Sequence, residues 1–230
     1  MASADSGREA VVDRPGFHWR VPAVAEDYDS RRFDNLKGRL YRRLEERALQ
    51  QALAGVEPGS TVLDAACGTG RVTAFLRGKG FRPTGYDISE AMIKVARRRL
   101  ESLGYPEVTF AAGDAEHLPY PARSFDAATC VGLLMHLDAD ARVGVLRQLA
   151  RVARGRLVVQ YGFLHPFNQD RERLTGHVPG NVRHCIREPE LQSDLERSGL
   201  TERARFWALR GLSTSVVLVL TRRDSAPIPE

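Results

Sequence analysis

Hydrophobic and polar positions follow two spacings along this chain. From residue 31 to about residue 55, apolar residues recur every three or four positions, which is typical of an amphipathic helix. Residues 1–30 contain two separate prolines and a mixture of polar and apolar residues that follows neither spacing. We therefore expect an N-terminal arm or lid there. The apolar positions of the predicted helix are Phe33, Leu36, Leu40, Leu44, Ala48 and Ala52.

Beyond residue 57, short β-rich runs alternate with helical patterns. Strands that are separated by helices form parallel sheets with right-handed crossovers. The last two runs are joined by too few residues for such a crossover, so the last strand should be antiparallel. We predict an α/β fold: a Rossmann-like, doubly wound sheet of seven strands, mostly parallel. The expected strands are about 61–63, 83–86, 108–110, 125–131, 157–159, 203–209 and 215–221, and the expected helices are 71–77, 90–103, 139–152 and 188–197.

The size of the chain fits one domain. It has 230 residues, of which 43% are hydrophobic and 27% charged, and this composition is typical of a globular protein. We expect a single domain over residues 31–223 and a flexible tail over 224–230. The long connection over 162–187 is expected to cover the substrate side, because loops of this length in compact domains are usually functional.

The sequence shows neither a membrane or secretory segment nor a cysteine pattern typical of disulfides or metal sites. No apolar run approaches the length that crosses a bilayer, and residues 1–16 lack the apolar centre of a secretory signal, so we expect a cytoplasmic protein without membrane insertion. Cys67, Cys130 and Cys185 are far apart and form no Cys-x-x-Cys pair. We therefore expect neither a disulfide framework nor a metal site.

The most informative stretch is a glycine turn that follows the first predicted strand and opens a helix. Residues 64–70 have the sequence Asp-Ala-Ala-Cys-Gly-Thr-Gly, at the carboxyl end of a strand, where open α/β sheets bind ligands. A phosphate-binding P-loop is excluded because Gly78-Lys79 is followed by glycine, and Thr73 weakens a dinucleotide fingerprint. A nucleoside with a cationic amino-acid tail fits best, because Asp64 precedes the glycines.

These residues resemble motif I of the class I S-adenosylmethionine-dependent methyltransferases. The resemblance extends over about residues 24–221 through Tyr86-Asp87-Ile88-Ser89, Gly113-Asp114-Ala115-Glu116 and Ser124-Phe125-Asp126. It implies that S-adenosylmethionine is the cofactor and S-adenosylhomocysteine the product, with Asp87 on the ribose hydroxyls and Asp114 on the adenine amino group. The cofactor-binding residues that the resemblance implies are Tyr28, Asp64, Ala66, Gly68, Gly70, Asp87, Ile88, Met92, Asp114, Ala115 and Cys130.

A softer resemblance points to the small-molecule branch of this family, the methyltransferase type 11 or quinone-methyltransferase-like enzymes. It rests on residues 28–33, on Phe125-Asp126 and on residues 133–137. The branch commonly has two histidines after the fourth strand, and Met135 replaces one of them here. Methyl transfer from a sulfonium needs few catalytic groups beyond alignment, but a hydroxyl or acidic-carbon acceptor benefits from a base. His136 is the candidate.

The possible classes of methyl acceptor can be narrowed by the motifs that the chain lacks. The chain lacks the Asn/Asp-Pro-Pro motif of amino-methylating enzymes, the Pro-Cys nucleophile of pyrimidine carbon-5 enzymes and the paired glutamates of protein-arginine enzymes. A small molecule is therefore the favoured acceptor. The net charge is +5, and its positive excess lies in residues 141–210, so RNA methylation stays as an alternative. A catalytically silent cofactor-binding protein is the third reading.

Overall fold

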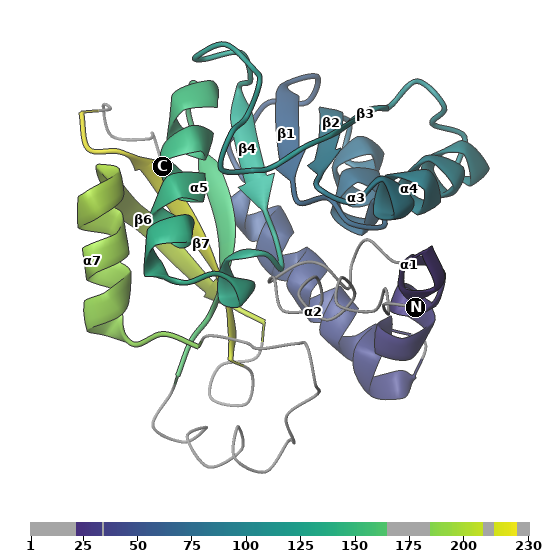
Figure 1. Ribbon diagram of the computed structural model, residues 1–230, viewed down its shortest axis with the longest axis horizontal. Coiled ribbons are helices and arrows are strands. Elements are labelled where there is room, and N and C mark those ends of the chain that lie inside the picture. The colour runs from purple at the N-terminus through teal and green to yellow at the C-terminus, as the bar shows by residue number, and fades with distance from the viewer. Residues whose placement is uncertain (1–21, 34, 165–184, 209–213, 225–230) are drawn as a thin grey trace, which may run out of the picture.

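The computed structural model describes residues 22–33, 35–164, 185–208 and 214–224, and within them seven strands form one sheet (Figure 1). The strand order is β3-β2-β1-β4-β5-β7-β6. Strand β7 pairs antiparallel with both β5 and β6, and the other neighbours are parallel. The predicted sheet is confirmed. The strands are β1 (Thr61–Ala65), β2 (Arg82–Asp87), β3 (Thr109–Ala112), β4 (Ala127–Cys130), β5 (Leu157–Gly162), β6 (Leu200–Trp207) and β7 (Ser215–Arg222).

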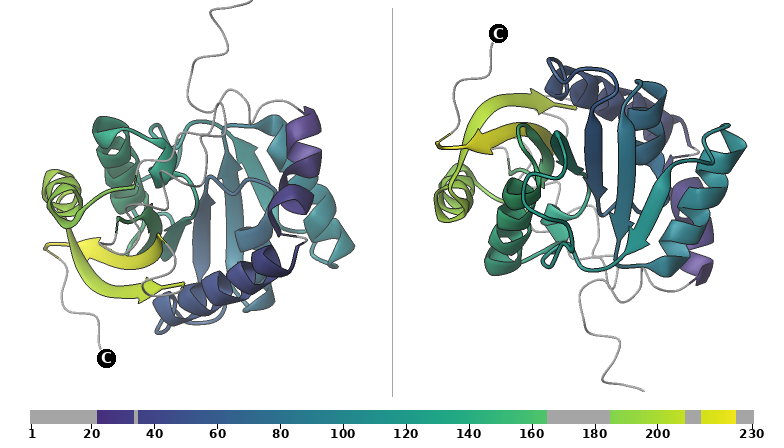
Figure 2. Two further views of the ribbon diagram at one scale, coloured as in Figure 1. Left: turned by 90° about the horizontal axis from the view of Figure 1, so that it is seen from below. Right: turned by 90° about the horizontal axis from the view of Figure 1, so that it is seen from above.

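Helices cover both faces of this sheet. Helices α2, α3 and α4 pack on one face, and α5 and α7 pack on the other (Figure 2). The described chain has no helix between β3 and β4, where Tyr86, Tyr120 and Phe125 instead pack edge to face. The helices are α1 (Pro22–Phe33), α2 (Leu36–Ala52), α3 (Arg71–Gly78), α4 (Glu90–Ser102), α5 (Ala139–Val152) and α7 (Glu188–Ser198), with a short 3₁₀ helix η2 (Leu134–His136).

The core consists of two apolar layers, one on each face of the sheet. Leu63 and Val159 point towards α5 and α7, whereas Val62 and Val158 point towards α2 and α3. This alternation follows from the two-residue period of a strand, and both faces are apolar because both are covered. Burying each such side chain contributes roughly 1.5–3 kcal/mol. The sheet is thus a firm frame for the loops at its carboxyl edge.

The N-terminal region differs from the prediction. Residues 22–30, which we expected to be part of an arm or lid, belong to helix α1, and their role as an arm or lid stays a prediction. The helical pattern predicted from residue 31 belongs to two helices, α1 and α2. Proline is favoured in the first turn of a helix, which suits Pro22 at the start of α1. Asn35 then starts α2 as its N-cap, accepting a hydrogen bond from the Gly38 N–H at 2.8 Å.

The buried face of α2 also differs from the predicted stripe. Ala48 and Ala52 are buried as expected, but Leu36 and Leu40 are 76% and 55% exposed. Helix α2 contacts β6 and β7 of the sheet, and it also contacts α1. Among its residues, those buried are Gly38, Glu45, Ala48, Leu49 and Ala52. The periodicity identified a helix, but it could not show which half of that helix reaches the sheet.

Several predicted segments lie wholly or partly outside the described residues. These are residues 1–21 of the arm, 165–184 of the 162–187 connection and 225–230 of the tail. At the described ends of the connection, Phe163 and Ile186 form a parallel bridge. Within the described part of the chain, no helix is long and apolar enough to span a bilayer, and no cluster of potential ligands could hold a metal ion.

Candidate functional site

The glycine loop between β1 and α3 presents open backbone at the carboxyl edge of the sheet. Gly68 has φ of +53°, and a Cβ placed on it would meet nothing within 4 Å. The loop is fixed from the β2 side, because Cys67 donates its N–H to the Tyr86 carbonyl at 3.1 Å and Gly68 donates its N–H to Asp87 Oδ2 at 2.8 Å. A ligand can therefore approach the main chain at Gly68 without displacing a side chain.

Gly70 serves a different purpose from Gly68. Its φ is +75°, and a Cβ there would lie 2.8 Å from the Ala96 Cβ and 3.0 Å from the Ala96 Cα on α4. Real Cβ atoms do not approach a backbone this closely, so glycine lets α4 pack against the loop. The structure therefore explains Gly70 by helix packing, and its expected contact with the cofactor stays a prediction.

Asp64 lies beneath the loop rather than on its surface. The side chain is 1% exposed, and its two oxygens accept hydrogen bonds from Thr73 Oγ1 at 2.6 Å and Thr129 Oγ1 at 2.8 Å. Burial raises the pKa of Asp64 to about 6, although the two hydroxyls partly oppose that rise. Asp64 thus joins β1, α3 and β4. Its expected contact with the cationic tail of a ligand stays a prediction.

Asp87 and Ile88 stand together at the end of β2. Asp87 Oδ2 accepts the Gly68 N–H, and Oδ1 accepts the Ser89 N–H at 2.9 Å. Burial raises the pKa of Asp87, and these two backbone bonds oppose the rise. Ile88 is 40% exposed. A carboxylate beside an exposed apolar side chain matches a sugar edge next to a flat ring, as in a nucleoside.

The end of β3 adds a second, more accessible acid. Asp114 is 48% exposed at its side chain, and its Oδ1 accepts the Glu116 N–H at 2.9 Å. Gly113 beside it is required by packing, because a Cβ there would lie 1.9 Å from the Tyr86 hydroxyl oxygen. Asp87 and Asp114 follow the neighbouring parallel strands β2 and β3. The structure therefore brings both predicted acids to one edge of the sheet.

The other residues predicted to bind the cofactor are either buried or half-buried. Met92, Ala115 and Cys130 are buried, and their expected contacts with the cofactor stay predictions. Burial also raises the pKa of the Cys130 thiol, which keeps it protonated. Tyr28 on α1 and Ala66 in the loop are half-buried, and Ala66 has an unusual positive φ of 57°.

His136, the predicted base, lies in the turn that follows β4. The chain passes through Gly132, where φ is +85° and a Cβ would meet nothing within 4 Å, and then enters η2. His136 is half-buried, and its N–H donates to the Leu133 carbonyl at 2.8 Å. Met135, in place of the second histidine of the family, is a buried core residue as expected.

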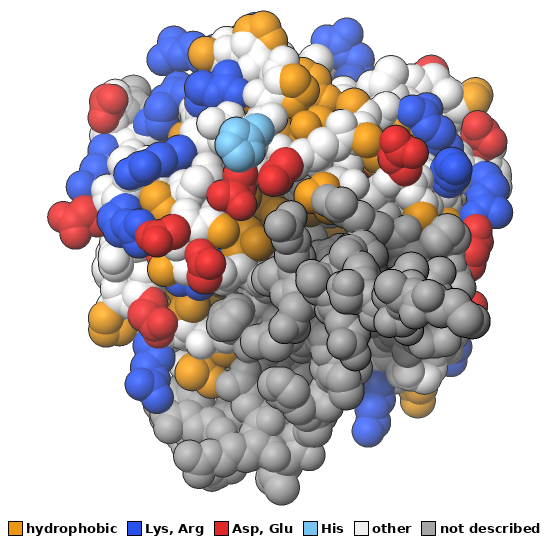
Figure 3. Space-filling view, viewed as in Figure 1, with side chains coloured by type: hydrophobic (Ala, Val, Ile, Leu, Met, Phe, Trp, Pro, Cys, Tyr) orange, Lys and Arg blue, Asp and Glu red, His pale blue; other side chains and the backbone are white. Residues whose placement is uncertain are grey.

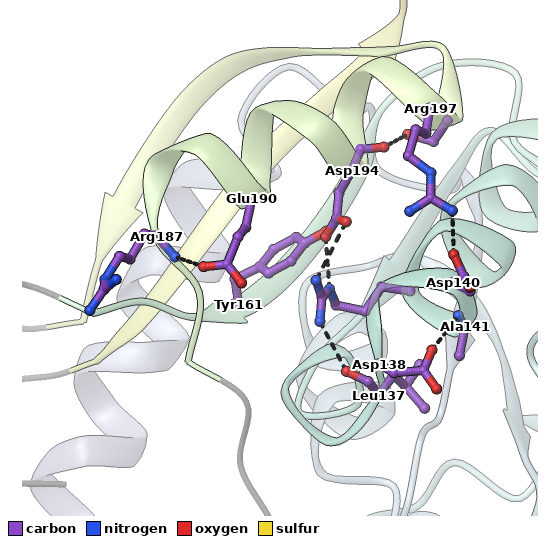
Figure 4. Close-up of polar contacts among 11 residues, drawn as sticks. Leu137, Asp138, Asp140, Ala141, Tyr161, Arg187, Glu190, Asp194 and Arg197 are labelled. Atoms are coloured by element: carbon purple, nitrogen blue, oxygen red, sulfur yellow. Dashed lines mark hydrogen bonds and ion pairs between the residues drawn. The ribbon is translucent and has the colours of Figure 1, made fainter.

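A buried ion pair supports this turn from the α5 side. Arg142 donates through Nε to Asp194 Oδ2 at 2.7 Å and through Nη1 to the Leu137 carbonyl at 3.0 Å, one residue after His136. Tyr161 of β5 donates its hydroxyl to the same Asp194 oxygen at 3.1 Å (Figure 4). The cluster thus links α5, α7, β5 and the His136 turn.

Two polar contacts near the loop, one part-buried and one buried, could not be predicted from the sequence. Arg99 of α4 donates to both oxygens of Thr69, which lies between the two loop glycines. Glu45 of α2 accepts a hydrogen bond from Gln160 Nε2 at 2.6 Å and lies 2.6 Å from an Arg71 nitrogen at the start of α3. These pairs are distant in sequence and follow no helical or strand period. Only the assembled fold brings them together.

Comparisons with known proteins agree with this arrangement. A family model described as a methyltransferase domain matches residues 62–155, which include the glycine loop and the turn with His136. The methyltransferase GfsG of Streptomyces halstedii is 39% identical over 45% of this chain, and demethylmenaquinone methyltransferase of Beutenbergia cavernae is 40% identical over 51%. The chain spans only 38% and 46% of the length of these two relatives.

Solved structures share the whole fold. Magnesium protoporphyrin IX methyltransferase of Synechocystis, crystallised with bound S-adenosylhomocysteine, superposes with a TM-score of 0.69 over 87% of this chain and 98% of that chain, at 23% identity. This likeness establishes the fold. The protein therefore has the class I methyltransferase fold, and residues 62–155 match a methyltransferase domain.

Proposed function

We propose that the protein is a methyltransferase that uses S-adenosylmethionine to methylate a small molecule. The observation that carries the proposal is the open backbone at Gly68, which is fixed by Asp87 at the carboxyl edge of the sheet. The residues fit the cofactor, because the space beside Gly68 is free of side chains and an acid and an apolar side chain follow β2. When bound, S-adenosylmethionine supplies a methyl group that is already activated on a sulfonium.

The residues of the site then bind, orient and exclude water. Asp87 carries lone pairs beyond the two that accept backbone N–H groups, so it can also accept ribose hydroxyls. Asp114 is exposed and can accept the adenine amino group. Ile88 offers apolar surface beside them. These contacts hold the cofactor in one orientation, which is the main requirement of an in-line displacement.

His136 is the proposed general base. It lies past the end of β4, the strand beside β1, and the turn that carries it is held by Arg142. An imidazole has a pKa near neutrality, so it can take a proton from an acceptor hydroxyl or an acidic carbon as the methyl group arrives. Its proton leaves to water when the product departs.

The contacts of the described arginines favour a small-molecule acceptor over RNA. Many of the described arginines in the basic segment donate to acids or to backbone carbonyls rather than lining a free groove, and in Figure 3 basic and acidic side chains are interspersed. The names of the relatives, among them demethylmenaquinone methyltransferase and magnesium protoporphyrin IX methyltransferase, also point to small acceptors. The arginines engaged in this way are Arg142, Arg147, Arg151, Arg154, Arg156, Arg197 and Arg205.

The test combines cofactor binding with methyl transfer. Calorimetry should detect S-adenosylhomocysteine binding to the whole chain, and Asp87→Ala should weaken it at least tenfold, or about 1.4 kcal/mol. Transfer of a labelled methyl group should then be assayed on a panel of quinols, phenols and porphyrins. His136→Ala should lower turnover about 100-fold or more and leave S-adenosylhomocysteine affinity nearly unchanged.

Three results would each contradict one part of this proposal. Failure of the wild-type chain to bind either cofactor form would remove the function altogether. Binding without transfer to any acceptor of the panel, together with transfer to RNA, would replace the small-molecule acceptor by the RNA alternative. An equal loss of cofactor affinity in His136→Ala would assign that histidine to structure rather than to proton transfer.

A further inference from the structure

Three consecutive arginines on α4, Arg97, Arg98 and Arg99, make different sets of contacts. Successive helical residues point about 100° apart, so neighbours in sequence do not share a face. Arg97 donates to the Phe110 carbonyl at 2.8 Å, and Arg98 forms an ion pair with Glu26 of α1. Arg99 contacts α1 and the glycine loop at once. This double contact distinguishes Arg99 from its neighbours.

Arg99 holds the centre of the loop. Its Nη1 lies 3.0 Å from the Thr69 carbonyl oxygen and 3.2 Å from Thr69 Oγ1. On the opposite side of the loop, the Gly68 N–H is held by Asp87. Both sides of the segment from Gly68 to Thr69 are therefore fixed by side chains, one from α4 and one from β2.

The other nitrogen of the same guanidinium binds α1. Arg99 Nη2 pairs with Asp29 Oδ2, and the two side chains are 28% and 21% exposed, against 60% and 54% for the Arg98–Glu26 pair. The second oxygen of Asp29 is buried without a hydrogen-bond donor. An unsatisfied buried acceptor destabilises the fold unless another interaction compensates for it. Helix α1 thus keeps a partly buried acid beside the loop, held there by Arg99.

We propose that Arg99 is a positioning residue that couples the docking of α1 to the cofactor-binding conformation of the glycine loop. The inference rests on the proposed function and extends it to a residue that touches neither cofactor nor acceptor. Because one rigid guanidinium makes both contacts, a loop that is ordered by ligand favours the Arg99 position that also binds Asp29. Coupling between two such equilibria is reciprocal. Cofactor should therefore stabilise docked α1, and docked α1 should tighten cofactor binding.

The experiment compares adjacent arginines in the full chain. S-adenosylhomocysteine affinity is measured by calorimetry for wild type, Arg99→Ala, Arg99→Lys, Asp29→Asn and Arg98→Ala, and amide hydrogen exchange of residues 22–33 is followed with and without this ligand. Arg98→Ala is the matched control, because it removes an ion pair to α1 that does not reach the loop. Circular dichroism and thermal melting verify that each variant folds.

The expected pattern separates coupling from simple stabilisation. Wild type should show slower exchange in α1 when ligand is added, and Arg98→Ala should retain most of this protection with affinity within about twofold. Arg99→Ala should lose the added protection and bind the ligand about tenfold more weakly. Asp29→Asn should lose protection with a smaller loss of affinity. Arg99→Lys keeps a charge for Asp29 but not the two-sided fork, so its affinity should lie between those of wild type and Arg99→Ala.

The outcomes distinguish the inference from the proposed function. If wild type binds the ligand but Arg99→Ala binds it as tightly, with the same protection of α1, the coupling is wrong and the proposed function stands. Equal losses in Arg98→Ala and Arg99→Ala would also overturn it, since general weakening of α1 would then explain both. If wild type does not bind the ligand, the proposed function fails, and this inference fails with it.

Discussion

Gly68 and Gly70 show how one residue type serves two purposes within a single loop. Both have positive φ, but a Cβ at Gly68 would enter open space and one at Gly70 would strike α4. A left-handed conformation alone costs a non-glycine residue roughly 1–2 kcal/mol. A substitution at Gly68 should therefore mainly lower affinity for the cofactor, and one at Gly70 should mainly lower the stability of the fold.

Replacing each glycine by alanine tests this division. Gly68→Ala should lower the free energy of unfolding by about 1–2 kcal/mol and weaken S-adenosylhomocysteine binding at least tenfold, since the added methyl group enters the approach path. Gly70→Ala should lose about 1–3 kcal/mol more stability, because α4 must move. Chemical denaturation and calorimetry measure the two effects. Equal losses of stability in both variants would argue against the packing role of Gly70.

The buried Asp64 makes stability depend on pH. Its pKa is raised by burial from 3.8 to about 6, so the folded state holds its proton more tightly than the unfolded chain does. This contribution to stability is fully present below the unfolded pKa and is lost as pH rises through about 6. The shift of about two units corresponds to about 3 kcal/mol.

Asp64→Asn isolates that contribution. The amide cannot ionise, so the stability of wild type relative to this variant should fall by about 3 kcal/mol between roughly pH 3.5 and pH 7. Denaturant unfolding of both proteins across this pH range measures the difference in their free energies of unfolding. The contributions of the other acids cancel in this difference because both proteins contain them. A difference that is constant with pH would mean that Asp64 does not change its protonation within the fold.

At the scale of the elements, α5, α7 and β5 meet at the buried pair of Arg142 and Asp194. The carboxylate accepts bonds from Arg142 and from Tyr161, and the guanidinium also satisfies the Leu137 carbonyl. Few buried ionic groups improve stability over an apolar substitute of both partners, but removing one partner leaves an uncompensated charge. The pair fixes where the His136 turn lies relative to α5.

Removing Arg142 alone should therefore be severe. Arg142→Met should lower the free energy of unfolding by about 3–5 kcal/mol, because Asp194 and the Leu137 carbonyl lose their donors. The control is Arg197→Met on α7, whose exposed ion pair with Asp140 should matter by less than about 1 kcal/mol. Thermal and denaturant unfolding report both values. Similar small losses in the two variants would show that the buried pair adds nothing to the fold.

The sequence predicted the elements better than it predicted their contacts. Helix α5 over Ala139–Val152 and the reversed strand β7 follow from local period and connection length, and both are confirmed. The start of α1 at Pro22 and the exposure of Leu36 depend on where helices meet other elements, which no local period encodes. For the same reason the motif located Asp64 and Gly70 in the loop, but not the threonines and the helix that they contact.

At the scale of the whole molecule, positive charge is balanced locally. The net charge is +5, yet Arg205 is held by Glu188 and Glu202, and these carboxylates raise its pKa. Arg154 likewise pairs with Asp126. A polyanion would have to displace these partners before it contacted either arginine, so we expect the chain to bind nucleic acid weakly.

Binding of mixed tRNA across a salt series measures this directly. The chain should bind weakly at about 50 mM salt and lose nearly all affinity by about 200 mM, as nonspecific phosphate contacts do. A dissociation constant below about 1 μM that persists at the higher salt would contradict the argument and favour the RNA alternative. Heparin in place of tRNA serves as the control for charge alone.

One feature of the packing bears on how the protein forms during synthesis. Helix α2, near the start of the chain, buries Ala48 and Leu49 in the same apolar layer as Val217 and Val219 of β7, the last strand. Strand β7 also supplies the antiparallel partner of both β5 and β6. A nascent chain that has not yet released Ser215–Arg222 from the ribosome therefore leaves one face of α2 and one edge of β5 uncovered. Such surfaces attract chaperones and other nascent chains, so the sheet cannot be completed until Ser215–Arg222 has left the ribosome.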